Sequence, residues 1–235
     1  MSVDQWNLLS NLVHSYDEYY GYSFAEDYVR VQNALIVKLH FKQTSVRDFF
    51  TVLMGKTQLG IEKNRDLLSL SAHDRSILLQ DTAQYTASLG GIFMLRQHHL
   101  FDYEPFYNSC EVIFRPSSAV FTRRTIEQFD PDSTLIKLTL GIFAFSAMNY
   151  TIYMENTMIS PVNMKAIMSI QDMYVEVTWR YLLYKYSYHG AVIRFLNLIK
   201  CLFLVNSAIV EANDSDQFIE IIDTVVEQTE QTRLQ

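Results

Sequence analysis

The stretch that decides the fold covers residues 60–79 and has the sequence GIEKNRDLLSLSAHDRSILL. Its pattern predicts two helices that meet at a short elbow. Ser71 or Asp74 can supply a side-chain oxygen to the backbone N–H groups that lack partners where the second helix starts. The aliphatic side chains spaced to point inward across this elbow are Leu67, Leu70, Ile77 and Leu78.

The same stretch resembles the signature of nuclear-receptor ligand-binding domains. The chain departs from that signature where Gly60 replaces an aromatic residue and Arg75 replaces a glutamine. An ordinary helical hairpin would contain the same leucines, but it would not require an aspartate, a long polar side chain and a double leucine in this order. An unrelated helical bundle is the alternative. The positions in register are Ile61, Glu62, Leu67, Leu70, Asp74, Leu78 and Leu79.

The resemblance implies an all-α fold, a three-layer antiparallel α-helical sandwich with a small β-hairpin. Composition favours a single domain over residues 1–235, because 49% of the residues are hydrophobic and only 4 prolines and 7 glycines punctuate the chain. We expect the hairpin within residues 102–121, where Pro105 and Pro116 mark a change of character and the runs CEVIF and AVF suit short strands. Apolar residues recurring at three and four predict helices over residues 6–16, 24–39, 45–61, 74–98, 134–154, 167–188, 191–211 and 217–226.

The chain has 19 basic and 26 acidic residues, which gives a formal net charge of −7. Because this balance opposes attraction to nucleic acid, we expect no direct nucleic-acid binding. Cys110 and Cys201 have no zinc-ligand spacing, so they cannot form the DNA-binding zinc fingers that most receptors carry. The chain is then either a ligand-binding domain taken from a longer receptor or a receptor that lacks the finger module.

Two apolar segments raise the question of a membrane. Residues 138–154 are 17 residues without a charge, and residues 201–210 form a shorter apolar run. The first contains Ser146 and Asn149 and is at the lower limit of length for a bilayer span, and the second is too short. We expect buried helices and no membrane contact. The N-terminus also lacks the pattern of a signal peptide.

The tail resembles the activation helix of the same family. Residues 217–222, QFIEII, fit its pattern with Gln217 as the one departure. The resemblance implies that Glu220 is the acidic half of a charge clamp that grips an LxxLL-type coregulator helix. An ordinary amphipathic terminal helix would show the same pattern.

The basic half of this clamp is altered. The aligned position is Glu62, where a carboxylate would face the electronegative C-terminal end of the bound peptide. This favours an altered partner motif, repression or constitutive behaviour over ordinary coactivator recruitment. The coregulator-binding residues implied by the resemblance are Glu62, Lys63, Arg75, Leu79, Gln80, Phe218, Glu220, Ile221 and Ile222.

The resemblance also implies a cavity for a small hydrophobic ligand, with Arg96 as the anchor for an acidic group. The 15 Phe and 15 Tyr can equally fill this cavity and leave a domain without a ligand. The candidate ligand-binding residues are Phe50, Leu53, Met54, Thr57, Gln58, Ser88, Ile92, Arg96, Phe114, Phe121, Phe143 and Val205.

Enzymatic interpretations find little support in the sequence. The six histidines show no HExxH or other metal spacing, and no phosphate-binding glycine loop or GxSxG elbow occurs. We expect no enzymatic activity, no cofactor and no metal. A helical enzyme acting on prenyl substrates would need paired Asp-rich helix motifs, which are missing.

The favoured function is a ligand-regulated transcription factor module located in the nucleus, with the cytoplasm as a second location. A bound hydrophobic molecule would bias the position of the last helix and so select coregulators. The alternative is a ligand-independent protein-interaction module of the orphan or corepressor-like kind. In either form we expect a homodimer or a heterodimer with a nuclear receptor, formed through the face around residues 194–210.

Overall fold

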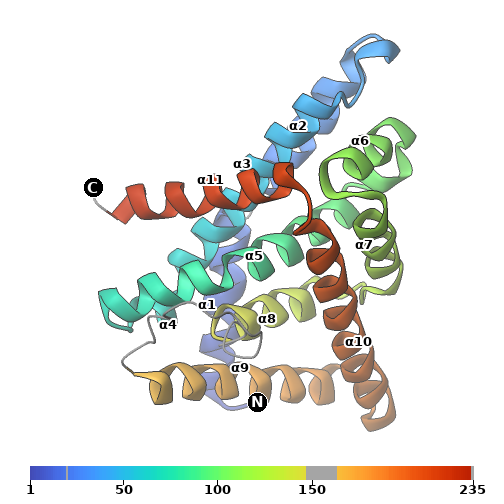
Figure 1. Cartoon of the computed structure of the whole chain (residues 1–235). Helices are drawn as coiled ribbons and strands as arrows, with labels where there is room; N and C mark the ends of the chain where they lie inside the picture. The colour runs from blue at the N-terminus through green and yellow to red at the C-terminus, as the bar shows by residue number, and fades with distance from the viewer. Residues whose placement is uncertain (20, 147–162, 234–235) are drawn as a thin grey trace.

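The computed structural model describes residues 1–19, 21–146 and 163–233, and within these residues it contains helices and no strand (Figure 1). The predicted all-α class is confirmed for this part of the chain. The short 3-10 helices are η1 (Val37–Leu39) and η2 (Leu100–Asp102). The α-helices are α1 (Val3–Tyr19), α2 (Tyr22–Ala34), α3 (Gln43–Glu62), α4 (Arg65–Leu68), α5 (Ala72–Gln97), α6 (Glu104–Phe114), α7 (Pro116–Gln128), α8 (Ser133–Ala144), α9 (Met164–Lys185), α10 (Tyr188–Ala212) and α11 (Asp216–Arg233).

Helix α5 is the central element, because α3, α7, α8, α10 and α11 all pack against it. From Thr82 to Leu95 every side chain except Gln84 is buried. Polar side chains on such a helix must find partners inside the protein. The hydroxyl of Thr82 donates to the backbone carbonyl oxygen of Leu78 at 2.7 Å. The hydroxyl of Thr86 donates to the backbone carbonyl oxygen of Thr82 at 2.8 Å.

The elbow predicted from residues 60–79 is present as α4 and the start of α5. Ser71 caps α5, because its Oγ accepts a hydrogen bond from the backbone N–H of Asp74 at 3.0 Å. The same hydroxyl donates to Asp74 Oδ2 at 2.9 Å. The inward-pointing side chains are all buried, as the sequence predicted: Leu67, Leu70, Ile77 and Leu78.

Asn64 links this elbow to α9 through hydrogen bonds, although the sequence pattern did not single it out. Its Oδ1 caps α4, and its Nδ2 donates to the hydroxyl of Tyr174 at 3.0 Å. That hydroxyl donates to Asp66 Oδ2 at 2.6 Å. Burial, followed by the neighbouring Asp66 carboxylate, raises the pKa of Tyr174 well above its ordinary value, so the phenol stays protonated and keeps donating.

The prediction of a β-hairpin at residues 102–121 is wrong, because this segment forms η2, α6 and the start of α7. Pro105 lies in the first turn of α6 and Pro116 is the first residue of α7, positions where proline needs no N–H partner and favours helix initiation. Arg115, with a φ of 74°, makes the turn between the two helices. The buried residues Phe106, Cys110 and Ile113 follow the helical period, not the alternation of a strand.

Other predicted helix boundaries also change. The helix expected at residues 24–39 ends at Ala34, and η1 follows it as a separate turn. The apolar helix expected at residues 134–154 is α8, which ends at Ala144, and the rest of that prediction beyond residue 146 lies outside the described residues. Most residues of α8 are buried, as expected. The helix packs so closely on α9 that a Cβ added at Gly141 would lie 2.9 Å from the ring of Tyr174. The last helix is longer than predicted, since α11 runs to Arg233 and not to Val226.

Candidate functional site

An apolar cavity lies among α3, α5, α6, α7 and α10, and α11 closes it. Its volume is about 40 Å³. From the predicted ligand-binding set, five residues line it: Phe50, Met54, Ser88, Ile92 and Phe114.

The other predicted ligand-binding residues do not line this cavity. Gln58 donates to the backbone carbonyl of Leu79 at 3.0 Å, and Arg96 donates to the backbone carbonyl of Asp130. Arg96 is therefore bonded to the connection between α7 and α8 and does not line this cavity. The predicted residues outside the lining are Leu53, Thr57, Gln58, Arg96, Phe121, Phe143 and Val205.

Most of the lining that sequence reasoning missed comes from α6, α7 and α10. The α6 and α7 residues were missed because the segment was predicted to be a hairpin. Two i, i+4 pairs, Cys110 with Phe114 and Ser118 with Thr122, are the signal that would have identified two helical faces. The missed lining residues are Gly91, Leu95, Phe101, Cys110, Ser118, Ala119, Thr122, Ala208, Ile209 and Ala212.

Aromatic side chains from α3, α6 and α11 meet at the cavity. The ring of Phe114 stands edge-on to Phe50 at 4.6 Å and to Phe218 at 5.7 Å between ring centroids. Pockets for drug-sized ligands measure roughly 300–1,000 Å³. A volume of about 40 Å³ therefore has room for water-sized contents and not for a hormone-sized molecule.

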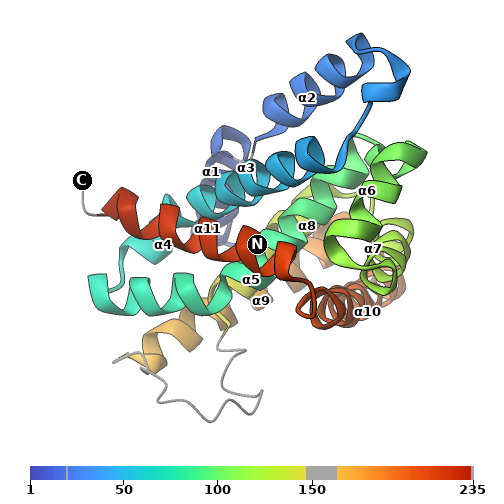
Figure 2. The same cartoon turned by 45° about the horizontal axis from the view of Figure 1, so that its top comes forward.

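Helix α11 lies lengthwise against α3 and α5 (Figure 2). Its buried residues recur at three and four along one face, so the helix presents a single apolar stripe to the rest of the chain. Thr229 can join that stripe because its hydroxyl donates to the backbone carbonyl of Val225 at 2.9 Å. The stripe consists of Phe218, Ile221, Val225 and Thr229.

Polar contacts along both edges of α11 supplement this stripe. Glu220 Oε2 lies 3.2 Å from Arg47 Nη1 of α3, and Gln80 Nε2 of α5 donates to Glu230 Oε1 at 2.5 Å. A Cβ added at Gly55 of α3 would lie 3.0 Å from Gln228 Oε1. The second half of α11 thus lies against α3 and α5, beside Glu62 and Gln80 of the predicted coregulator-binding set.

This arrangement buries some of the predicted coregulator-binding residues and leaves others exposed. Those on the apolar side of α11 face the interior: Phe218 and Ile221 are buried and Ile222 is half-buried. Leu79 is buried in α5, and Arg75 Nη1 donates to the carbonyl of Leu68 at 3.4 Å. Glu62 lies beside α11 in a hollow that Leu59 and Val225 also line, and Lys63 is exposed at the end of α3.

Helix α10 differs from α11 in being apolar on two faces. Its buried side includes Leu198, Cys201 and Val205, and its outer side exposes further large apolar residues. Within the part of the chain that the structure describes, α10 alone is long and apolar enough to cross a membrane, and 22% of its most apolar window is buried. The exposed large apolar residues of its sequence are Tyr188, Ile193, Leu196, Ile199, Phe203 and Val210.

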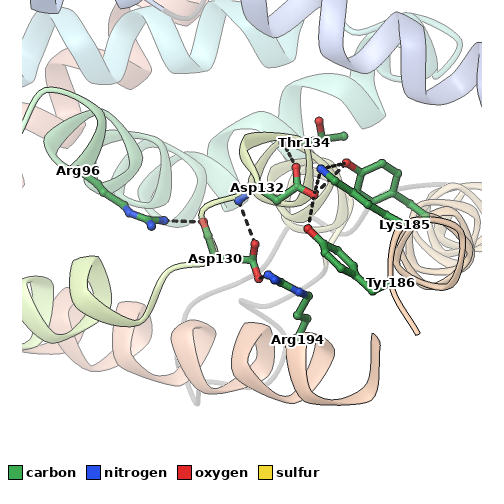
Figure 3. A network of polar contacts seen from close by, with 8 residues as sticks. Arg96, Asp130, Asp132, Thr134, Lys185, Tyr186 and Arg194 are labelled. Atoms are coloured by element: carbon green, nitrogen blue, oxygen red, sulfur yellow. Dashed lines mark hydrogen bonds and ion pairs between the residues drawn. The ribbon is translucent and has the colours of Figure 1, made fainter. Parts of the chain in front are cut away.

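A polar network holds the start of α10 against the end of α7 and the end of α9 (Figure 3). Arg194 of α10 pairs with Asp130. Asp132 Oδ2 accepts hydrogen bonds from Lys185 Nζ at 2.8 Å, from the Tyr181 hydroxyl at 2.9 Å and from the Tyr186 hydroxyl at 3.2 Å. With Arg96 of α5, which donates to the carbonyl of Asp130, this network joins the end of α5, the connection between α7 and α8, and the junction of α9 and α10.

The pKa of Asp132 reflects these partners. Burial works to raise it, but the hydrogen bonds from Lys185, Tyr181 and Tyr186 and the Lys185 charge outweigh burial and lower the pKa below its ordinary value. The same contacts raise the pKa of Lys185. Asp132 and Lys185 are therefore both ionised at neutral pH, and their contact holds the start of α8 against the end of α9.

The two thiols lack the environment of a reactive cysteine. Burial raises the pKa of Cys201 to about 11 and that of Cys110 well above its ordinary value. Both cysteines are free and buried. Among the residues that the structure describes, no group of three or more His, Cys, Asp or Glu side chains is arranged to hold a metal ion.

Comparison of the chain with protein-family models, with curated proteins and with solved structures finds no match. The likeness to nuclear-receptor ligand-binding domains therefore rests on the residues quoted above alone.

Proposed function

We propose that this chain is a domain of the nuclear-receptor ligand-binding type, a three-layer helical sandwich that works in the nucleus as a ligand-independent protein-interaction module. The observation that carries the proposal is the packing around Phe218. This side chain from α11 packs edge-on against Phe114 and closes a cavity of about 40 Å³ that has room only for water-sized contents, so no bound molecule is needed to seat the last helix.

The position of α11 also argues for altered partner recruitment. A coregulator helix that entered between α3 and α5 would compete with the second half of α11, whose Val225 and Thr229 are buried there. Glu220, the expected acidic half of the clamp, is paired with Arg47. Glu62 at the other end of the groove would repel the electronegative end of a peptide helix. Recruitment through this groove then requires α11 to move, and α10 offers the freely accessible surface.

Native mass spectrometry of the purified chain tests the proposal. We expect a mass equal to that of the polypeptide, with no small molecule that leaves on denaturation. A hydrophobic adduct at one per chain would contradict the ligand-independent function and identify the chemical class of the ligand.

A ligand-regulated module is the second candidate, favoured by the apolar lining of the cavity and by Met54 within it, a side chain that adapts readily to a changed volume. If an adduct is found, Ser88→Trp is the test of its position, because Ser88 lines the cavity and Trp would fill it. Loss of the adduct from a folded Ser88→Trp protein would assign the ligand to this cavity. Retention of the adduct would place it elsewhere.

A further inference from the structure

Another hollow lies on the opposite side of α5 from the apolar cavity. Its volume is about 340 Å³, which is within the range of small-molecule pockets, whereas the apolar cavity measures about 40 Å³. At about 100° per residue, Phe93, Met94 and Gln97 of α5 project away from the α5 residues that line the apolar cavity. We call this hollow the α1–α8 cleft, because the end of α1 and the start of α8 contribute to its walls. The residues that line it are Tyr16, Asp17, Tyr22, Phe93, Met94, Gln97, Ser133 and Lys137.

Lys137 of α8 is the residue that marks this cleft as a binding site. Only 8% of its surface is exposed, although a lysine is seldom buried to this degree. Its ammonium group donates hydrogen bonds and accepts none, and it has more donors than one partner can use. Asp17 of α1 is its one partner among the residues that the structure describes, so the remaining donors of a nearly buried charge have no protein acceptor. An oxygen atom of a ligand in the cleft would supply this acceptor.

Asp17 places a hydrogen-bond acceptor beside this donor. Its side chain is 62% exposed and that of Lys137 is 10% exposed, so the carboxylate lies toward the mouth of the cleft and the ammonium toward its base. The two charges cancel, and a simple anion is a poor ligand because it would meet Asp17 at the mouth. A neutral group with a carbonyl oxygen next to an N–H can bond to Lys137 and Asp17 together and leave their ion pair intact. A lactam edge, which is a ring carbonyl beside a ring N–H, is such a group.

The other residues of the cleft suit a flat ring. The buried side chains of Phe93 and Met94 line it, and a thioether makes favourable contacts with aromatic rings. The ring of Tyr22 packs on that of His98 with 4.6 Å between the ring centroids, which holds Tyr22 at the wall of the cleft. Within the described ranges of the chain, the Gln97 amide forms no hydrogen bond, so it can bond to a second edge of the ligand.

We propose that the α1–α8 cleft binds a planar heterocycle with a lactam edge, the chemical class that includes guanine and the flavin ring. Lys137 donates to the ring carbonyl and Asp17 accepts from the ring N–H. An α-amino acid suits the cleft less well, because its carboxylate and ammonium would each compete with the ion pair already formed there. The cleft lies on the other side of α5 from Phe218, so this site does not bear on how α11 is seated.

Titration of the whole chain with guanosine and with riboflavin, followed by saturation-transfer difference NMR, tests this assignment. We expect both to bind with dissociation constants of about 1 mM or below. Adenosine, which lacks a lactam edge, should bind about tenfold or more weakly than guanosine, and so should phenylalanine, the probe for an amino acid. Absence of binding by both guanosine and riboflavin would overturn the proposal. Binding of adenosine or phenylalanine as tight as that of guanosine would also overturn it.

Two variants locate the ligand. Lys137→Met keeps most of the side-chain volume and removes the ammonium, so guanosine should bind about tenfold or more weakly. Gln97→Trp fills the cleft from its half-buried wall and should abolish binding, which keeps the test available if Lys137→Met lowers stability. Lys165→Met, a change at an exposed lysine of α9 outside the cleft, is the matched control and should bind guanosine as the wild type does. Guanosine binding that both cleft variants leave unchanged would overturn the proposed site.

Discussion

Helices α10 and α11 follow each other in the chain and both pack on α5, yet they present opposite surfaces to solvent. The outer side of α11 carries acidic residues, among them Asp223 and Glu227, and its apolar stripe is buried against α3 and α5. The outer side of α10 exposes a second apolar stripe with Lys200 at its centre. The large apolar side chains of α11 other than Ile219 are thus buried or half-buried within the chain, whereas α10 leaves six exposed.

This difference indicates where regulation and recognition lie. A helix with one apolar stripe completes the core of its own domain, and its contribution is to stability. A helix with two apolar faces contributes one to the core and leaves the other for a second molecule. Mutations on α11 should therefore change folding stability, and mutations on the outer face of α10 should change association.

The largest effect is expected for Phe218→Ala in α11. The Phe218 side chain is 2% exposed and closes the cavity, so its removal should lower the free energy of unfolding by about 3–5 kcal/mol. The matched change on α10, Phe203→Ala, removes a side chain that is 70% exposed and should alter the free energy of unfolding by about 0.5 kcal/mol or less. Urea unfolding of both variants measures the two values. Similar losses of unfolding free energy in the two variants would contradict the assignment of stability to α11 and of association to the outer face of α10.

An intermediate effect is expected for Asp132→Asn in the network that seats the start of α10. Asparagine would weaken or lose the hydrogen bonds from Lys185 and Tyr181, so the free energy of unfolding at neutral pH should fall by about 1–3 kcal/mol. The folded-state pKa of Asp132 is lowered, so its stabilising contribution is complete above the unfolded-state pKa of about 3.9. That contribution is lost as the pH falls through the lower folded-state value.

The difference in unfolding free energy between wild type and Asp132→Asn should therefore shrink on acidification below about pH 4. Urea unfolding across this pH range measures it. Asp172→Asn, a change at an exposed residue of α9, serves as the control and should change stability little at neutral pH. If this difference in unfolding free energy increased in acid, the Asp132 carboxyl would not be held ionised by its partners.

The parts of the structure that the sequence predicted are those with local causes. Ser71 and the leucines around it define the elbow because a cap and its helix lie within four residues of each other. The network at Asp132 could not be predicted, because Lys185 and Tyr186 lie more than fifty residues away in the sequence.

Two errors have specific physical reasons. Pro105 and Pro116 separate the runs CEVIF and AVF, which suit short strands, from the helical pattern, but proline in the first turn of a helix starts a helix equally well. The predicted last helix ends at residue 226, whereas α11 continues through Thr229, a polar residue in its apolar pattern. A threonine can still be buried there, since its hydroxyl bonds to the carbonyl of the preceding turn. The turns of α11 beyond residue 226 lie beside Glu62 and Gln80, two of the predicted coregulator-binding residues.

The smallest effect is expected for Glu220→Gln, which breaks the ion pair between α11 and Arg47. Both side chains are about half exposed or more, and exposed pairs contribute about 0–1 kcal/mol, which salt screens further. The loss of unfolding free energy should therefore stay below about 1 kcal/mol and vanish in about 1 M sodium chloride. Glu227→Gln, a change at an exposed acid of the same helix, is the control for the altered net charge. A loss from Glu220→Gln as large as that from Phe218→Ala would mean that charge, and not the apolar stripe, holds α11 in the groove.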